Sequence, residues 1–296
     1  MSTPFESPAT DARAAQPGAL PLQPGVMALV FVMTTLVTRF VIECCGGGLL
    51  VGGLAAADPS DASSIPPGGL ALVTLIMLAV LGGVAVAFAW GSGHTTRTLG
   101  LRRGSLWVYP LAVMGGLTVG LSSGDLGSWL QEIVPDILQF GQLDAIGEGL
   151  TGGSWLGRGL MLIAVCLGAP LFEELVFRGT LWGLLERALP GWAVLLVTSS
   201  LFAVYHIDPI HVILVFPVAL LLGWTRLTSG SLFPCILLHA VNNGLAAVAV
   251  FTLDADLVTP IWLAAACALM TLFTALLMWL GRYREAVRPS SRTQTR

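Results

Sequence analysis

Residues 171–179 read Leu-Phe-Glu-Glu-Leu-Val-Phe-Arg-Gly and place three charged groups inside an otherwise apolar stretch. These groups are the adjacent carboxylates of Glu173 and Glu174 and the guanidinium of Arg178. A single charged side chain at the centre of a bilayer costs about 2.5–3.5 kcal/mol on insertion scales. Charges at that depth face a protein interior or a water-filled cavity and mark functional sites. The stretch therefore predicts a membrane helix with a polar inner face.

The composition of the whole chain is that of a membrane protein. Hydrophobic residues make up 55% of the 296 residues, charged residues only 10%, and the mean hydropathy is +0.83. About a quarter of the residues of a soluble domain are charged, so the soluble class is excluded. The net charge of −3 is too small to indicate nucleic-acid binding. The five cysteines form no Cys-x-x-Cys pair, and we expect buried free thiols.

Hydropathy predicts an all-α polytopic membrane protein with about eight transmembrane helices. The expected spans are residues 26–54, 70–90, 106–121, 159–185, 192–207, 210–227, 232–252 and 261–280. Residues 24–281 are expected to form one membrane domain. A disordered N-terminal lead, which is no cleavable signal peptide, should occupy residues 1–23, and a basic cytoplasmic tail residues 282–296.

Loop charges predict the orientation of these spans. An even number of spans places both termini on one side of the membrane. The loops on that side carry most of the arginines (Arg97, Arg102, Arg103, Arg187, Arg226 and the arginines after residue 281), whereas acidic residues dominate the opposite loops. Because basic loops stay inside, we expect both termini to be cytoplasmic.

Several local features of the spans carry structural expectations. Arg39 and Glu43 lie four residues apart on one helical face and should form an intramembrane ion pair. Gly116-x-x-x-Gly120 predicts close packing against another helix. Pro170 removes a backbone donor, so the fourth span should kink just before Glu173. The long acidic connection at 122–158 is expected to hold an interfacial helix around residues 129–140.

Few strongly polar side chains remain within the last five spans once the loops are removed, and those that remain fall on three helices. The fourth, fifth and seventh predicted helices would form the site. The fourth contributes Glu173, Glu174 and Arg178, and the fifth contributes His206, with Phe202 four residues before it. The seventh contributes His239 and Asn243, with Asn242 beside them. Side chains four residues apart share a helical face, so each helix directs its set inward.

These residue types favour hydrolysis with water as the nucleophile. A carboxylate in a low-dielectric cavity gains pKa and can take a proton from water and return it to a leaving amine. Imidazoles can bind a metal ion or polarise a carbonyl, and Asn243 could donate to an oxyanion. Two histidines and a glutamate could hold Zn2+, yet the local His-Glu-x-x-His signature is missing. Metal-dependent and metal-free hydrolysis therefore both stay open.

Three motifs carry a family resemblance. Glu-Glu-x-x-x-Arg at 173–178, Phe-x-x-x-His at 202–206 and His-x-x-x-Asn at 239–243 resemble the motifs of the CPBP family, in the family's order and without departure at the key positions. This family contains the type II CAAX prenyl endopeptidases and the bacterial Abi proteins linked to bacteriocin processing and immunity. The motifs fall within residues 170–245, and the eight-span layout extends the likeness over most of the chain.

The resemblance implies an intramembrane endopeptidase of a bacterial cell membrane that acts on a membrane-associated or lipidated protein or peptide. It implies that Glu173 activates water, that Glu174 and Arg178 support it, and that Asn243 helps to stabilise the oxyanion. His206 and His239 would bind a metal, with Glu173 as a third ligand, or orient the water. Family members have been described both as metalloproteases and as glutamate-dependent enzymes, so Zn2+ stays an open expectation.

Other interpretations of the same residues compete with this one. The cluster could simply hold a helix bundle together, as in a non-catalytic immunity protein or partner. It could also serve a proton-coupled carrier, which should show paired broken helices in two halves. Asp208 and His211 are expected to be solvated helix ends, with a role near the site as the alternative, and Arg226 is expected to be an anchor at the membrane surface.

Overall fold

The predicted all-α, polytopic architecture is confirmed. The computed structural model describes residues 22–57, 67–133, 142–152, 154–252 and 261–287, and these residues form helices joined by short connections. Within them, six helices are long and apolar enough to cross a membrane, and the apolar helix at Gly191–Tyr205 is shorter. The chain is therefore an integral membrane protein.

Each of the eight predicted spans corresponds to one helix or one run of helices. In order they are α1 (Pro24–Ala57), α2 (Pro67–Gly91), α4 (Val108–Ile133), the run Trp155–Leu185, α9 (Gly191–Tyr205), α10 (Pro209–Ser229), α11 (Phe233–Thr252) and α12 (Ile261–Val287). Two short helices, α3 (Thr95–Thr98) and α5 (Gln142–Thr151), lie in the connections.

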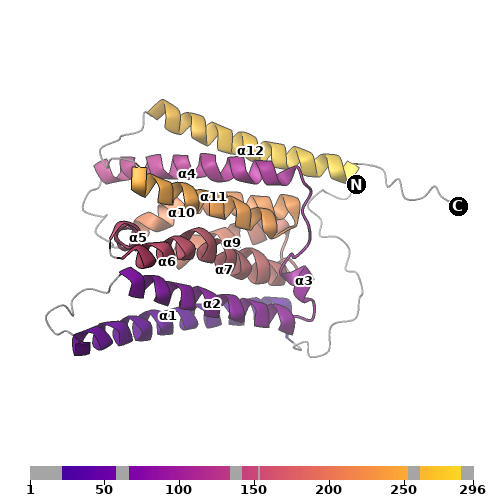
Figure 1. The fold of residues 1–296 in the computed structure, drawn as a ribbon. Helices are drawn as coiled ribbons and strands as arrows, with labels where there is room; N and C mark the ends of the chain where they lie inside the picture. The colour runs from indigo at the N-terminus through magenta and orange to yellow at the C-terminus, as the bar shows by residue number, and fades with distance from the viewer. Residues whose placement is uncertain (1–21, 58–66, 134–141, 153, 253–260, 288–296) are drawn as a thin grey trace.

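The long helices run roughly alongside one another as a bundle (Figure 1). Helices α12 and α4 lie at one edge, and α4 packs against α10, α11 and α12. Helices α1 and α2 pack together at the opposite edge. The run Trp155–Leu185 lies between these two groups and contacts both α2 and α11. This central position surrounds Glu173, Glu174 and Arg178 with protein.

Some predicted boundaries are wrong. Helix α4 does not stop near residue 121 but continues through Trp129 to Ile133, and the rest of the predicted interfacial helix, residues 134–141, lies outside the described residues. Helix α12 continues to Val287, past the predicted start of the tail. The side chain of Glu43 also lies outside the described residues, so its pairing with Arg39 stays a prediction. Element ends are the part of a helix that sequence patterns define least well.

Gly116 and Gly120 permit the close approach of α4 and α11, as the motif predicts. A Cβ atom added at Gly116 would lie 2.6 Å from the carbonyl oxygen of Leu238 on α11, and one at Gly120 would lie 3.0 Å from Asn242 Oδ1. Because Asn242 precedes Asn243, this contact sets how deeply the seventh predicted span sits in the bundle. The motif thus positions one wall of the candidate site.

We expect Gly116→Ala to destabilise the protein, because the new methyl group meets a backbone atom that cannot rotate away. Overpacking of this kind costs about 1–3 kcal/mol. Thermal unfolding in detergent measures the effect, and Gly124→Ala on the same helix is the matched control, since its Cβ meets nothing within 4 Å. An alanine there should be neutral or stabilising. Equal melting temperatures for Gly116→Ala and the parent would contradict the packing argument.

Candidate active site

The span that carries the two glutamates is not a regular α-helix. It consists of α6 (Trp155–Ile163), the π-helical turn η2 (Ala164–Gly168), α7 (Ala169–Glu174), a second π-helical segment η3 (Leu175–Leu181) and α8 (Trp182–Leu185). Pro170 lies in the first turn of α7 and has no N–H to donate. The sequence predicts a kink at this point; the structure instead widens the helix into π-turns on both sides of Glu173 and Glu174. Such π-turns recur at functional sites.

The first π-turn explains the position of Asn243. The amide of Ala169 bonds to the carbonyl of Ala164, and Pro170 has no amide, so the carbonyl of Val165 receives no donor from the following turn. Asn243 Nδ2 donates to this carbonyl at 2.9 Å, and its Oδ1 accepts from Asn242 Nδ2 at 3.1 Å. The amide of Asn243 thereby ties α11 to the irregular span.

Glu174 is completely buried and held by two donors at one oxygen. Its Oε1 accepts from Arg178 Nη1 at 3.0 Å and from His239 Nδ1 at 2.9 Å. Its Oε2 is buried and has no hydrogen-bond partner among the described residues. We assign the proton of the His239 ring to Nδ1, because a carboxylate paired with the Arg178 cation accepts hydrogen bonds. Glu174 therefore sets both the orientation and the tautomer of His239.

Arg178 is also completely buried and links three helices. Its Nη2 donates to the carbonyl of Ala219 on α10 at 2.9 Å, and its guanidinium lies 4.3 Å from the ring centroid of Phe202 on α9. The Arg178 carbonyl accepts from Arg226 Nε at 2.9 Å. Arg226 is itself buried, and its predicted role as a positive-inside anchor stays a prediction. Both arginines hold the irregular span against α10.

Glu173 has a different environment from its neighbour. Its side chain is 13% exposed, and its Oε2 lies 3.9 Å from His239 Nε2. It lines a small gap with Phe172, Val176, Phe177 and residues of α2 and α9. Glu173 thus faces the free nitrogen of the imidazole that Glu174 orients.

Phe202 is the aromatic centre of the cluster. Its buried ring lies 5.1 Å from the ring of His206 and 5.7 Å from that of His239, centroid to centroid, and beneath the guanidinium of Arg178. His206 Nδ1 lies 2.9 Å from the Phe202 carbonyl, which can only accept, so Nδ1 carries the proton. The i, i+4 spacing predicts that Phe202 and His206 share a helical face. It does not predict that Phe202 contacts residues of three helices.

A strained turn follows His206. Helix α9 ends at Tyr205, two residues earlier than the sequence predicts, and Ile207 has φ of +65°, a left-handed conformation that a β-branched residue rarely adopts. Asp208 is buried, not solvated as expected; its Oδ1 accepts from the amides of Ile210 and His211 and caps α10. The turn brings the ring of His211 to 4.4 Å from that of His206. His211 therefore lies near the candidate site. This position agrees with the alternative sequence interpretation and not with a solvated helix end.

Arg39 adds a side chain from the first helix. It is buried, donates from Nη1 to the main-chain carbonyl of Tyr205, and lies 4.0 Å from the centroid of the Tyr205 ring. The position of Arg39 inside the first apolar span is the feature of the sequence that predicts its burial. Its partner, Tyr205 on α9, was not predictable from spacing.

The structure brings the six predicted residues into one region, but not into a metal-binding set. No group of three His, Cys, Asp or Glu side chains among the described residues is arranged to hold a metal ion. Glu173 and His239 face each other, while the described contacts of His206 are with the Phe202 carbonyl and aromatic neighbours. As placed, the three expected ligands do not fit a zinc site.

The fold and the cluster together define a class of protein: an all-α membrane bundle whose facing helices bury carboxylates, imidazoles and a guanidinium. The sequence model of the type II CAAX prenyl endopeptidase Rce1-like family matches residues 155–245, which contain all six predicted site residues. The match agrees with the sequence resemblance to the CPBP family and limits it to this segment, which is similar to a CAAX-type intramembrane protease domain. No curated protein and no solved structure matches the chain.

The Glu174–Arg178 pair predicts a large stability effect. Arg178→Met should cost about 3–5 kcal/mol, because it leaves a buried carboxylate without its cation. Adding Glu174→Gln to Arg178→Met should restore part of the loss, since the uncompensated charge is then removed. Thermal unfolding in detergent measures both effects. Arg158→Met, an exposed arginine of the same span, is the control, and an equal loss there would contradict the prediction.

Proposed function

We propose that this protein is an intramembrane endopeptidase that hydrolyses a peptide bond of a membrane-associated or lipidated protein, with Glu173 as the residue that activates water. The observation that carries the proposal is the unequal environment of the two adjacent glutamates. Glu174 is bonded to Arg178 and His239, whereas Glu173 has no such partner at hydrogen-bond distance among the described contacts: its side chain is 13% exposed and its Oε2 lies 3.9 Å from His239 Nε2. A general base needs a carboxylate that is not already committed to a cation.

In the proposed reaction Glu173 is both the general base and the general acid. Glu173 takes a proton from water as the oxygen of that water attacks the scissile carbonyl carbon. The carbonyl oxygen then carries the negative charge of the tetrahedral intermediate. When the C–O double bond re-forms, the C–N bond breaks, and the proton on Glu173 passes to the departing amine. One residue therefore acts first as base and then as acid.

The other site residues would position the reacting groups. His239, with its proton on Nδ1, offers Nε2 as an acceptor near Glu173 and would orient the water. His206 has its proton on Nδ1 as well, so its Nε2 could hold the same water. One amide proton of Asn243 is directed at Val165; the other would stabilise the oxyanion.

The proposal routes no step through a metal. Zinc binding by Glu173, His206 and His239 stays a prediction of the sequence, because the three side chains as placed do not fit the ion. In this proposal the protein lies in the cell membrane of a bacterium. The charges of its loops predict that both termini are cytoplasmic.

Glu173→Gln should abolish cleavage without unfolding the protein. Glutamine keeps the size of the side chain but cannot take a proton, and loss of a general base lowers rates by about 10²–10⁴-fold. The measurement compares the membrane-associated peptides of cells that carry the parent or the variant, by mass spectrometry of new peptide termini. Melting temperature serves as the folding control. Identical sets of termini would contradict the protease and favour a non-catalytic partner or a carrier.

Chelation separates the two possible chemistries. If Glu173 alone activates water, purified protein treated with 1,10-phenanthroline should keep its cleavage activity. Loss of activity that added Zn2+ restores, together with loss of bound zinc in His239→Ala, would contradict the metal-free mechanism.

A further inference from the structure

Arg39 is a buried charge on a helix outside the segment that matches the protease family. It lies inside α1, only 6% of its surface is exposed, and the matched segment begins at residue 155. An arginine within a membrane span faces the protein interior and marks a functional site. The contacts of this guanidinium therefore indicate what α1 contributes to the candidate site.

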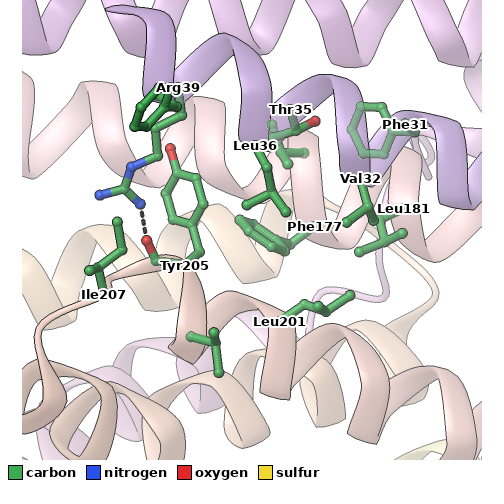
Figure 2. A pocket seen from close by; sticks show the side chains of 13 residues that line it. Phe31, Val32, Thr35, Leu36, Arg39, Phe177, Leu181, Leu201, Tyr205 and Ile207 are labelled. Atoms are coloured by element: carbon green, nitrogen blue, oxygen red, sulfur yellow. Dashed lines mark hydrogen bonds between the residues drawn. The ribbon is translucent and has the colours of Figure 1, made fainter. Parts of the chain in front are cut away.

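The guanidinium of Arg39 contacts the end of α9 in two ways. Its Nη1 donates to the main-chain carbonyl of Tyr205, and its central carbon lies 4.0 Å from the centroid of the Tyr205 ring (Figure 2). The carbonyl end of a helix carries a partial negative charge, so a cation is favourable there. The carbonyl and the ring together hold Arg39 against the last residue of α9.

The turn after α9 leaves the carbonyl of Tyr205 to a donor from another helix. In a continuing helix this carbonyl would accept from the amide four residues later, but that residue is Pro209, which has no amide proton. The amide of Asp208 bonds instead to the carbonyl of His206. Arg39 supplies a donor that the local backbone does not provide.

The position of this carbonyl determines where His206 lies. His206 follows Tyr205 directly, and Ile207 then adopts its left-handed φ of +65°. A non-glycine residue keeps such a conformation only where the surrounding structure fixes it. Arg39 holds the residue before this pair, and Asp208 caps α10 directly after it.

We propose that Arg39 is a positioning residue of the candidate site, which places the His206 imidazole for the reaction by holding the carbonyl of Tyr205. The inference rests on the proposed function, in which Nε2 of His206 holds the attacking water. Arg39 itself touches no reacting group. A displacement of about 1 Å at a site can lower a rate by about 10²-fold, so a contact from outside the matched segment can control turnover.

The charge of Arg39 offers a second route to the same site. This charge acts on Glu173 as well as on His206 and His211. An effect of the charge on Glu173 would not pass through His206. The two routes therefore differ in whether removal of the His206 imidazole cancels the effect of Arg39.

A double-mutant cycle measures this dependence. Full-length protein in liposomes cleaves a quenched fluorescent peptide, built on a site that is cut in cells with the parent and not with Glu173→Gln. Arg39→Met should lower kcat about 10- to 100-fold at unchanged KM, because the substrate still binds. In the His206→Ala background the same substitution should lower kcat less than about twofold, since no imidazole is left to place.

Arg39→Lys and Arg103→Met are the controls. Arg39→Lys should recover most of the lost kcat, because an ammonium group also donates to a carbonyl. Arg103→Met removes an exposed arginine outside the site and should match its parent in both backgrounds. If Arg39→Met does not fold, Arg39→Gln replaces it, since its amide stays polar but ends two bonds short of the Nη1 position.

Three kinetic results would overturn the inference. An equal loss of kcat with and without His206 would show that Arg39 acts by another route, such as its charge on Glu173. A raised KM at unchanged kcat would show a role in substrate binding. A loss of kcat that only follows the folded fraction, measured by thermal unfolding, would show a structural role alone.

Hydrogen exchange tests the placement without any substrate. Mass spectrometry of peptides that cover residues 203–212 should show faster exchange in Arg39→Met than in the parent or in Arg103→Met, because the turn loses the contact before it. Unchanged exchange would contradict the inference even in an active protease. Faster exchange in Arg39→Met, combined with a parent that shows no Glu173-dependent cleavage, would overturn the proposed function and leave the Arg39 contact as the support of the turn.

Discussion

The structure depends on the buried contact between Glu174, Arg178 and His239. Two charges taken out of water are tolerated only when their remaining polar groups are satisfied. Here one carboxylate oxygen accepts from both partners, and the guanidinium also donates to the carbonyl of Ala219. Since these groups belong to the irregular span, α10 and α11, the need to satisfy one ion pair fixes the mutual positions of three helices. The residues of the candidate site gain their geometry from this constraint.

Irregular backbone is the second requirement of the site. In a regular helix through residues 164–181 each backbone carbonyl would accept from an amide of the same helix. The carbonyl of Val165 would then not be available to Asn243. The π-turns on both sides of Glu173 and Glu174 free such groups where neighbouring helices can reach them. Within the described residues these turns lie in a single span, without the second broken helix that a two-halved carrier should have.

The site also reaches beyond the segment that matches the protease family. Arg39 of α1 contacts Tyr205, and Tyr205 forms part of the wall beside Glu173. A buried guanidinium on the first helix therefore links a peripheral element to the reactive centre. The first helix thus contacts the candidate site, although the candidate site residues themselves lie in the matched segment.

The sequence alone determined the class of protein and its eight helical segments, and it singled out the six residues that the structure brings into one region. Long apolar runs can satisfy their backbone only as helices in lipid, and charges such as Glu173 and Arg178 stand out against them. The i, i+4 rule paired Glu174 with Arg178 because both lie on one helix. Only the tertiary structure decided that Glu174, and not Glu173, is bonded to both Arg178 and His239, because His239 lies on another helix, 65 residues away. The roles of Phe202, Tyr205 and Arg39 were likewise settled by packing between helices, which no local spacing encodes.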